Sequence, residues 1–145
     1  MREFQTKKVF ENGNYYIGEL KKDVPDGIGS LFDNEGRVIY EGSWKNGQYN
    51  GYGKLCNLGG ESYEGDWKNG KRHGEGRMQY ANGDLYIGHF KDNLRCGDGV
   101  LIYADGSSYN GTFKNDLPNG RGTLISPRGE EKTGLFVKGK LFFGK

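Results

Sequence analysis

Three kinds of short segment in this sequence contain residue types that could do chemistry. The triplet His73-Gly74-Glu75 is similar to part of a zinc or deaminase motif, but no Cys-x-x-Cys follows to complete a ligand set. Residues 33–36, Asp-Asn-Glu-Gly, are acidic enough for calcium, yet they do not supply ligands at the spacing of a calcium loop. The Gly-x-Gly pairs lack the third glycine and the following helix of a phosphate-binding loop. We therefore predict no enzyme activity, no catalytic residue, no metal and no cofactor.

The glycine pairs belong to a pattern that recurs every 23 residues. Its first element, Tyr-x-Gly-x-aromatic, begins at Tyr40, Tyr63, Tyr86 and Tyr109, and an earlier copy begins at Tyr16. Each copy also carries the Gly-x-Gly pair and a fourth glycine at fixed distances, so most of the 27 glycines are periodic. A fixed period of this length indicates an array in which each unit buries its apolar side only by stacking on its neighbours.

Within each repeat the apolar residues recur with period 2, which is typical of β-strands. In residues 63–68 the aromatic side chains and the glycine share one face, while Glu64, Asp66 and Lys68 share the other. Turn-forming pairs such as Asn46-Gly47 and Asn82-Gly83 separate these strands. We predict an all-β fold: an elongated, single-layer, twisted antiparallel sheet of repeated β-hairpins. One extra residue after Gly36 predicts a β-bulge within 37–39.

The segment from Tyr63 to Gly76, Tyr-Glu-Gly-Asp-Trp-Lys-Asn-Gly-Lys-Arg-His-Gly-Glu-Gly, resembles the consensus of the MORN repeat, the membrane occupation and recognition nexus motif. The resemblance covers essentially the whole chain and predicts one array over residues 1–145. The expected boundaries are a half repeat at 6–15, full repeats at 16–39, 40–62, 63–85, 86–108 and 109–131, and a partial C-terminal repeat or cap at 132–145. The last copy has Lys132 in place of tyrosine, and its second strand must come from residues 141–143 without a Gly-x-Gly pair. We expect this apolar end either to fold back as a cap or to pair with its counterpart, giving a monomer or an edge-paired homodimer.

Composition limits the classes of partner. With 21 basic and 19 acidic residues the net charge is only +2, so we expect no nucleic-acid partner. The sequence has no 18-residue apolar run and no signal-peptide pattern at its start, and the repeat alignment makes Cys56 and Cys96 free thiols. These features predict a soluble, cytoplasmic chain. The resemblance implies association with the cytoskeleton or with membranes.

The aromatic side of the predicted sheet has nothing in the sequence to cover it. One interpretation is that the rings pack on glycines and on one another. The other is that they form a glycine-floored groove that binds an extended peptide or an amphipathic helix of a partner protein, which makes the chain a non-catalytic scaffold or adaptor. The predicted groove residues are Tyr40, Trp44, Tyr63, Trp67, Tyr86, Phe90, Tyr109, Phe113, Leu55, Met78, Tyr80, Leu101, Tyr103 and Leu124.

Two alternative functions remain open from the sequence. A row of lysines, one per full repeat, could contact anionic phospholipid, although Glu41, Glu64 and Asp66 alternate with it as on an ordinary solvated sheet. Its members are Lys21, Lys45, Lys68, Lys91 and Lys114. The resemblance also implies a second alternative, an accessory module of a larger enzyme, because MORN arrays occur beside methyltransferase and lipid kinase domains.

Overall fold

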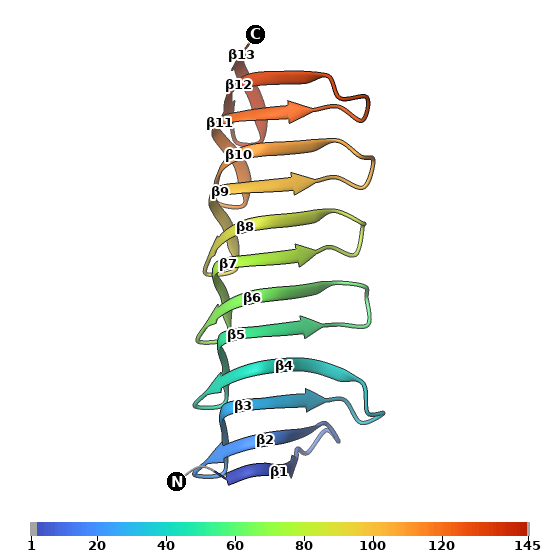
Figure 1. Ribbon diagram of the computed structural model, residues 1–145, viewed down its shortest axis with the longest axis vertical. Helices are drawn as coiled ribbons and strands as arrows, with labels where there is room; N and C mark the ends of the chain where they lie inside the picture. Colours follow the sequence, from blue (N-terminus) through green and yellow to red (C-terminus); the bar gives the residue numbers. More distant parts are fainter. Residues whose placement is uncertain (1–2, 145) are drawn as a thin grey trace. The chain divides into compact units, whose positions relative to one another are not determined.

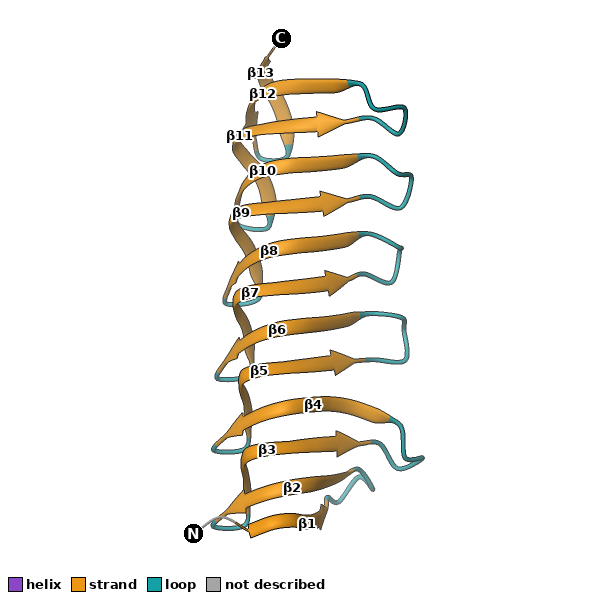
Figure 2. Cartoon of the chain, in the orientation of Figure 1, coloured by secondary structure: helices purple, strands orange, loops and turns teal. Residues whose placement is uncertain are grey.

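The structure is a computed structural model that describes residues 3–144. These residues form thirteen β-strands and no helix, as Figures 1 and 2 show. They divide into two compact units, Met1–Lys71 and Arg72–Lys145, called unit 1 and unit 2 below. Within each unit every strand pairs antiparallel with the next strand along the chain. The predicted all-β fold of antiparallel hairpins is confirmed.

The strand bounds are as follows. In unit 1 they are β1 Glu3–Val9, β2 Tyr15–Lys21, β3 Val24–Phe32, β4 Val38–Lys45, β5 Gln48–Cys56 and β6 Ser62–Lys68. In the second half of the chain they are β7 Lys71–Gln79, β8 Leu85–Lys91, β9 Leu94–Ile102, β10 Ser108–Lys114, β11 Leu117–Ile125, β12 Glu131–Val137 and β13 Lys140–Gly144. Residues 1–2 and 145 of the predicted array lie outside the described residues.

Two kinds of connection alternate along the chain. Within each unit, Figure 1 shows the short turns at one end of the strands, called the turn edge below, and the longer loops at the other end, called the loop edge. At the turn edge, two residues join the strands with positive φ at both, for example Asn46 (51°) and Gly47 (79°). Two consecutive positive φ angles define the type I′ turn, whose twist matches that of the flanking strands. Lys22 and Asp23 adopt the same conformation without a glycine. At the loop edge the connections are longer.

The two glycines of each Gly-x-Gly pair have different roles. In the β4–β5 hairpin Gly42 pairs with Gly53 and Trp44 pairs with Tyr49, so Ser43 faces three residues of β5. This bulge places Gly51, the first glycine of its pair, at φ +95°, a conformation that other residues rarely adopt. The second, Gly53, is needed for space instead, because a Cβ there would overlap the hydroxyl and ring of Tyr40.

The leading tyrosine of each full repeat is almost completely buried, between 0 and 1 % exposed. Its hydroxyl donates a hydrogen bond to the carbonyl three residues later, as from Tyr40 to Ser43 at 2.9 Å. The same bond occurs at Tyr16, Tyr63, Tyr86 and Tyr109. Burial raises the pKa of the Tyr40 phenol, and it raises the pKa of Tyr16 to about 12, with smaller contributions from two carboxylates. The tyrosine therefore closes the bulge as well as filling the core.

Edge-to-face ring contacts join successive hairpins within each unit. The ring of Tyr40 lies 5.0 Å from that of Trp44 in its own repeat and 5.8 Å from that of Trp67 in the next. In unit 2, Tyr86 meets Phe90 at 5.1 Å and Phe113 at 5.0 Å. Such offsets suit the ring quadrupoles. We call the side of the sheet that carries these rings the aromatic face.

Two places in the repeat are irregular. Leu31 pairs with Tyr40 and Phe32 pairs with Val38, which leaves Ile39 as the extra, bulged residue within the predicted 37–39 segment. At the C-terminus β13 folds back onto β12 through the turn at Lys138 and Gly139. Gly144 pairs with Gly134 there, so one glycine pair across the strands is kept although the Gly-x-Gly motif is missing.

Candidate functional site

Most of the residues predicted to form the groove are parts of the core. Alongside the buried tyrosines, Trp44 and Trp67 are each only 6 % exposed, and Phe90, Phe113, Met78 and Leu101 are buried too. The indole N–H of Trp44 donates to the Gly29 carbonyl, which satisfies it inside the protein. Four predicted residues are partly exposed on the aromatic face, where a partner could touch them directly. They are Leu55, Tyr80, Tyr103 and Leu124.

Unit 1 has a pocket of about 580 Å³ on its aromatic face. Its apolar lining comes from both edges of the sheet: Phe10 from the loop after β1, Leu31 from β3, and Pro25 and Tyr49 from just beyond the two-residue turns. Trp44 is the one predicted groove residue that lines it. Sequence reasoning did not include Phe10 and Leu31, although they align with the predicted residues Tyr80 and Leu55. It missed Pro25 and Tyr49 because the residue at their position in the repeat varies from copy to copy.

Polar groups surround this pocket. The Lys8 ammonium group forms an ion pair with the Asp23 carboxylate at 2.8 Å and donates to the Asp23 carbonyl at 2.9 Å. It also lies 6.0 Å from the ring centre of Phe10. The amides of Asn12, Asn14 and Gln48 complete the polar lining. An apolar floor with a few polar groups around it is typical of binding sites in this size range.

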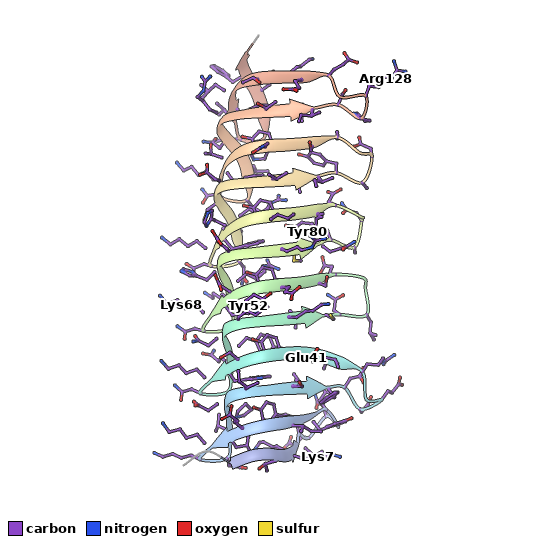
Figure 3. All side chains as sticks on the ribbon, in the orientation of Figure 1. Lys7, Glu41, Tyr52, Lys68, Tyr80 and Arg128 are labelled. Carbon is purple, nitrogen blue, oxygen red and sulfur yellow. The ribbon has the colours of Figure 1, made fainter. Side chains whose placement is uncertain are left out.

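In unit 2 an arginine lies across the aromatic face. The Arg95 guanidinium is within 5.5–5.7 Å of the ring centres of Tyr80, Tyr86 and Phe113. It is held by Asp116, whose carboxylate accepts from Nε at 2.9 Å and whose carbonyl accepts from Nη2 at 2.6 Å. Burial raises the pKa of the Tyr80 hydroxyl, and the nearby guanidinium partly offsets that rise. Figure 3 labels Tyr80.

The residue nine positions after each leading tyrosine, the position of Arg95, is hydrogen-bonded to the two-residue turn of the next repeat. Its carbonyl always accepts the N–H of the second turn residue, as from Gly47 to Pro25 at 2.8 Å and from Asp116 to Arg95 at 3.0 Å. Where this residue is proline, which has no N–H, the turn residue is Gly47 or Gly139. Where it is arginine, its backbone N–H donates to the side chain of the turn residue, from Arg72 to Asn93 and from Arg95 to Asp116. Each of the five turns after the first is therefore anchored to the preceding repeat.

All five lysines of the predicted row are exposed, each one residue before a two-residue turn. Lys68 is labelled in Figure 3 and projects from the turn edge. On the neighbouring strand positions Glu41, Glu64 and Asp66 are exposed as well. The row is thus accessible, with acidic side chains beside it.

The segments that could have done chemistry have structural roles. The Asp33 carboxylate accepts the N–H groups of Glu35 and Arg37 and pairs with the Arg37 side chain at 2.7 Å. These bonds, led by the one from the Arg37 backbone, hold the pKa of Asp33 below its usual value. No cluster of three or more His, Cys, Asp or Glu side chains suited to a metal ion occurs within residues 3–144. None of the described elements is a helix able to cross a bilayer.

The comparisons with known proteins agree with the geometry. The family model of the MORN repeat matches residues 16–37, 40–56, 63–85, 86–108 and 109–131. No individual curated protein matches the chain. MORN repeats are generally protein- or membrane-interaction modules and typically have no enzymatic activity. The five matches cover most of the sequence, so the chain belongs to the MORN repeat family.

Proposed function

We propose that the protein is a non-catalytic interaction module and that the aromatic face of unit 1 binds a segment of a partner polypeptide. The pocket of about 580 Å³ is the observation that carries this proposal. Its lining of Phe10, Leu31 and Trp44 is apolar, and an uncovered apolar surface with polar surroundings is typical of an interaction site.

The kind of partner follows from the shape of the surface. The pocket extends from the loop edge at Phe10 to the turn edge at Gly47 and Gln48, across the direction in which the strands follow one another. A polypeptide segment with one large side chain inserted here would bury that side chain and leave its backbone at the polar surroundings. Recognition of this kind places most of the binding energy in a few anchor residues.

Site-specific photo-cross-linking tests this proposal. A benzoylphenylalanine at Gln48, which is exposed beside the pocket, should capture a polypeptide from the native cell extract. The same group at Glu41, exposed on the opposite face, should not. Phe10→Asp should remove the product at position 48, while the control Ile28→Asp, at a residue 63 % exposed on the opposite face, should keep it.

Two results would contradict the proposal. One is equal capture from positions 48 and 41, which would indicate a non-selective surface. The other is a product that survives Phe10→Asp in a variant whose melting temperature matches that of the parent protein.

The accessible lysine row supports a second candidate, binding to anionic phospholipid. Each lysine near an anionic surface contributes about 1 kcal/mol. Replacing Lys21, Lys45 and Lys68 with glutamine should then reduce sedimentation with phosphatidylserine vesicles and leave cross-linking at position 48 intact. Unchanged sedimentation would eliminate the lipid hypothesis without affecting the first.

A further inference from the structure

The pocket of unit 1 corresponds to the space that Arg95 fills in unit 2. When the repeats are aligned, Pro25 takes the place of Arg95, Phe10 that of Tyr80, Trp44 that of Phe113, and Gly47 that of Asp116. All four of these unit 1 residues line the pocket. The counterparts of two of the three rings around Arg95, and of Asp116, therefore line the cavity.

The surroundings of Arg95 show which group this place in the fold accommodates. The arginine side chain is 13 % exposed, lies against three rings and donates to both the carbonyl and the carboxylate of Asp116. A planar guanidinium can stack on rings and donate hydrogen bonds in its own plane at the same time, which an ammonium group cannot do.

Pro25 leaves this place open. Its short ring cannot reach the position that the arginine head group takes in unit 2, and the partner residue at the next turn is Gly47, which has no side chain. The backbone bond from the Gly47 N–H to the Pro25 carbonyl, 2.8 Å long, keeps the turn in the same position relative to the strand as in the arginine-containing repeat. The backbone around the pocket is thus preserved, although unit 1 has no arginine side chain to fill it.

We propose that this pocket binds the guanidinium group of an arginine side chain supplied by a partner polypeptide. The inference rests on the proposed function and specifies its anchor residue. The rings of Phe10 and Trp44 take the roles of those of Tyr80 and Phe113, and the Gly47 carbonyl takes the role of the Asp116 carbonyl as acceptor.

The charged groups of the pocket are Lys8 and Asp23, which pair at 2.8 Å. The Asp23 side chain is 80 % exposed, so its carboxylate can also accept from an incoming guanidinium. In unit 2 the aligned residues are Met78 and Asn93, so the ion pair has no counterpart in the repeat that contains Arg95. Asp23→Asn should therefore weaken arginine binding, because it leaves the Lys8 charge without its partner. Lys8→Met should strengthen it.

The experiment is an NMR titration of the full chain with three capped tripeptides, acetyl-Gly-X-Gly-amide, in which X is arginine, citrulline or leucine. Citrulline keeps the shape of arginine and lacks its charge. We expect the arginine peptide to shift the Trp44 indole and Gly47 amide signals, with the citrulline peptide about ten-fold weaker. The double variant Pro25→Arg/Gly47→Asp rebuilds the Arg95–Asp116 pair and should no longer bind the arginine peptide.

Three outcomes overturn the assignment: no shift of these signals, equal binding of the citrulline or leucine peptide, or unchanged arginine binding by the double variant. If these occur while cross-linking at position 48 still depends on Phe10, the interaction surface stands and only its anchor is wrong. If the arginine peptide binds but no polypeptide is captured at position 48, the proposed function fails instead.

Discussion

The phenol ring of Tyr40 lies directly across the backbone of Gly53, on the paired strand of its own hairpin. Its hydroxyl continues past the glycine to the Ser43 carbonyl at the bulge. The approach is so close that even one methyl group on Gly53 would overlap the ring. A buried aromatic core in a single-layer sheet therefore depends on backbone without side chains beneath it.

Gly53→Ala should lower the free energy of unfolding by about 1–3 kcal/mol through overpacking, since the new methyl group meets a ring that is already held by its neighbours. Urea denaturation measures the change. Gly59→Ala is the control, because its φ is not positive and its Cβ would meet only the Asn57 side-chain oxygen, at 3.3 Å. Equal effects of the two substitutions would contradict the account.

Tyr40→Phe should cost about 1–2 kcal/mol, because it leaves the part-buried Ser43 carbonyl without its donor. In the same repeat, Tyr52→Phe removes a hydroxyl that donates to Glu64 from a ring 59 % exposed, and it should cost less than about 0.5 kcal/mol. Denaturation of both variants under the same conditions gives the comparison. A larger loss from Tyr52→Phe would show that the hydroxyls do not stabilise the bulges.

Alkaline pH should unfold the protein through its core tyrosines. Burial raises the pKa of Tyr16 from 10.0 to about 12, and it raises the pKa of Tyr40 and Tyr86 as well. Because the unfolded chain loses these protons first, stability should be constant up to pH 10 and should fall as the pH rises towards 12. Denaturation at a series of pH values tests this, and Tyr16→Phe should make the decrease shallower. A phenol absorbance change near pH 10 in the folded protein that Tyr16→Phe removes would rule the explanation out.

The repeat pattern was enough to predict the fold. Alternation in residues 63–68 and the Asn46-Gly47 turn specify a hairpin, because period 2 and consecutive positive φ angles each have a direct physical cause. The extra residue at Ile39 was detectable as a break in the period. The different roles of the two glycines were not predictable. Gly51 is required for its positive φ and Gly53 for the space that the Tyr40 ring takes, and a sequence does not distinguish these two requirements.

The candidate site was harder to predict than the fold. Residues that recur in every repeat, such as Tyr40 and Trp44, form the core that every repeat needs. The pocket depends on a position whose residue varies between repeats, with Pro25 where another repeat has Arg95, and on Phe10 from the incomplete first repeat. The link between Pro25 and Gly47, and between Arg95 and Asp116, is visible in the sequence only after the structure shows that these residues meet across repeats.

In unit 2 the acceptor of a hydrogen bond found in three other repeats is replaced, by His73 in one repeat and by Cys96 in the next. In three other repeats the residue before the Gly-x-Gly pair accepts the N–H of the first residue in the next two-residue turn: Asp26 from Asn46, Asn50 from Asn69, and Asn119 from Lys138. His73 occupies the same position, and its buried Nδ1 has no hydrogen-bond partner among the described residues.

His73→Asn should therefore stabilise the protein by about 1 kcal/mol, because the oxygen of the shorter amide can accept the N–H of Asp92, as Asn50 and Asn119 do at the same position, and the unpartnered Nδ1 is removed. His89→Asn is the matched control: the His89 side chain is 45 % exposed and lies 3.8 Å from Glu75, so its replacement should change stability by less than about 0.5 kcal/mol. Urea denaturation of both variants gives the stability changes, and hydrogen exchange of the Asp92 amide reports the new bond directly. Faster exchange at Asp92 in the His73→Asn protein would show that the histidine already protects this turn by another contact.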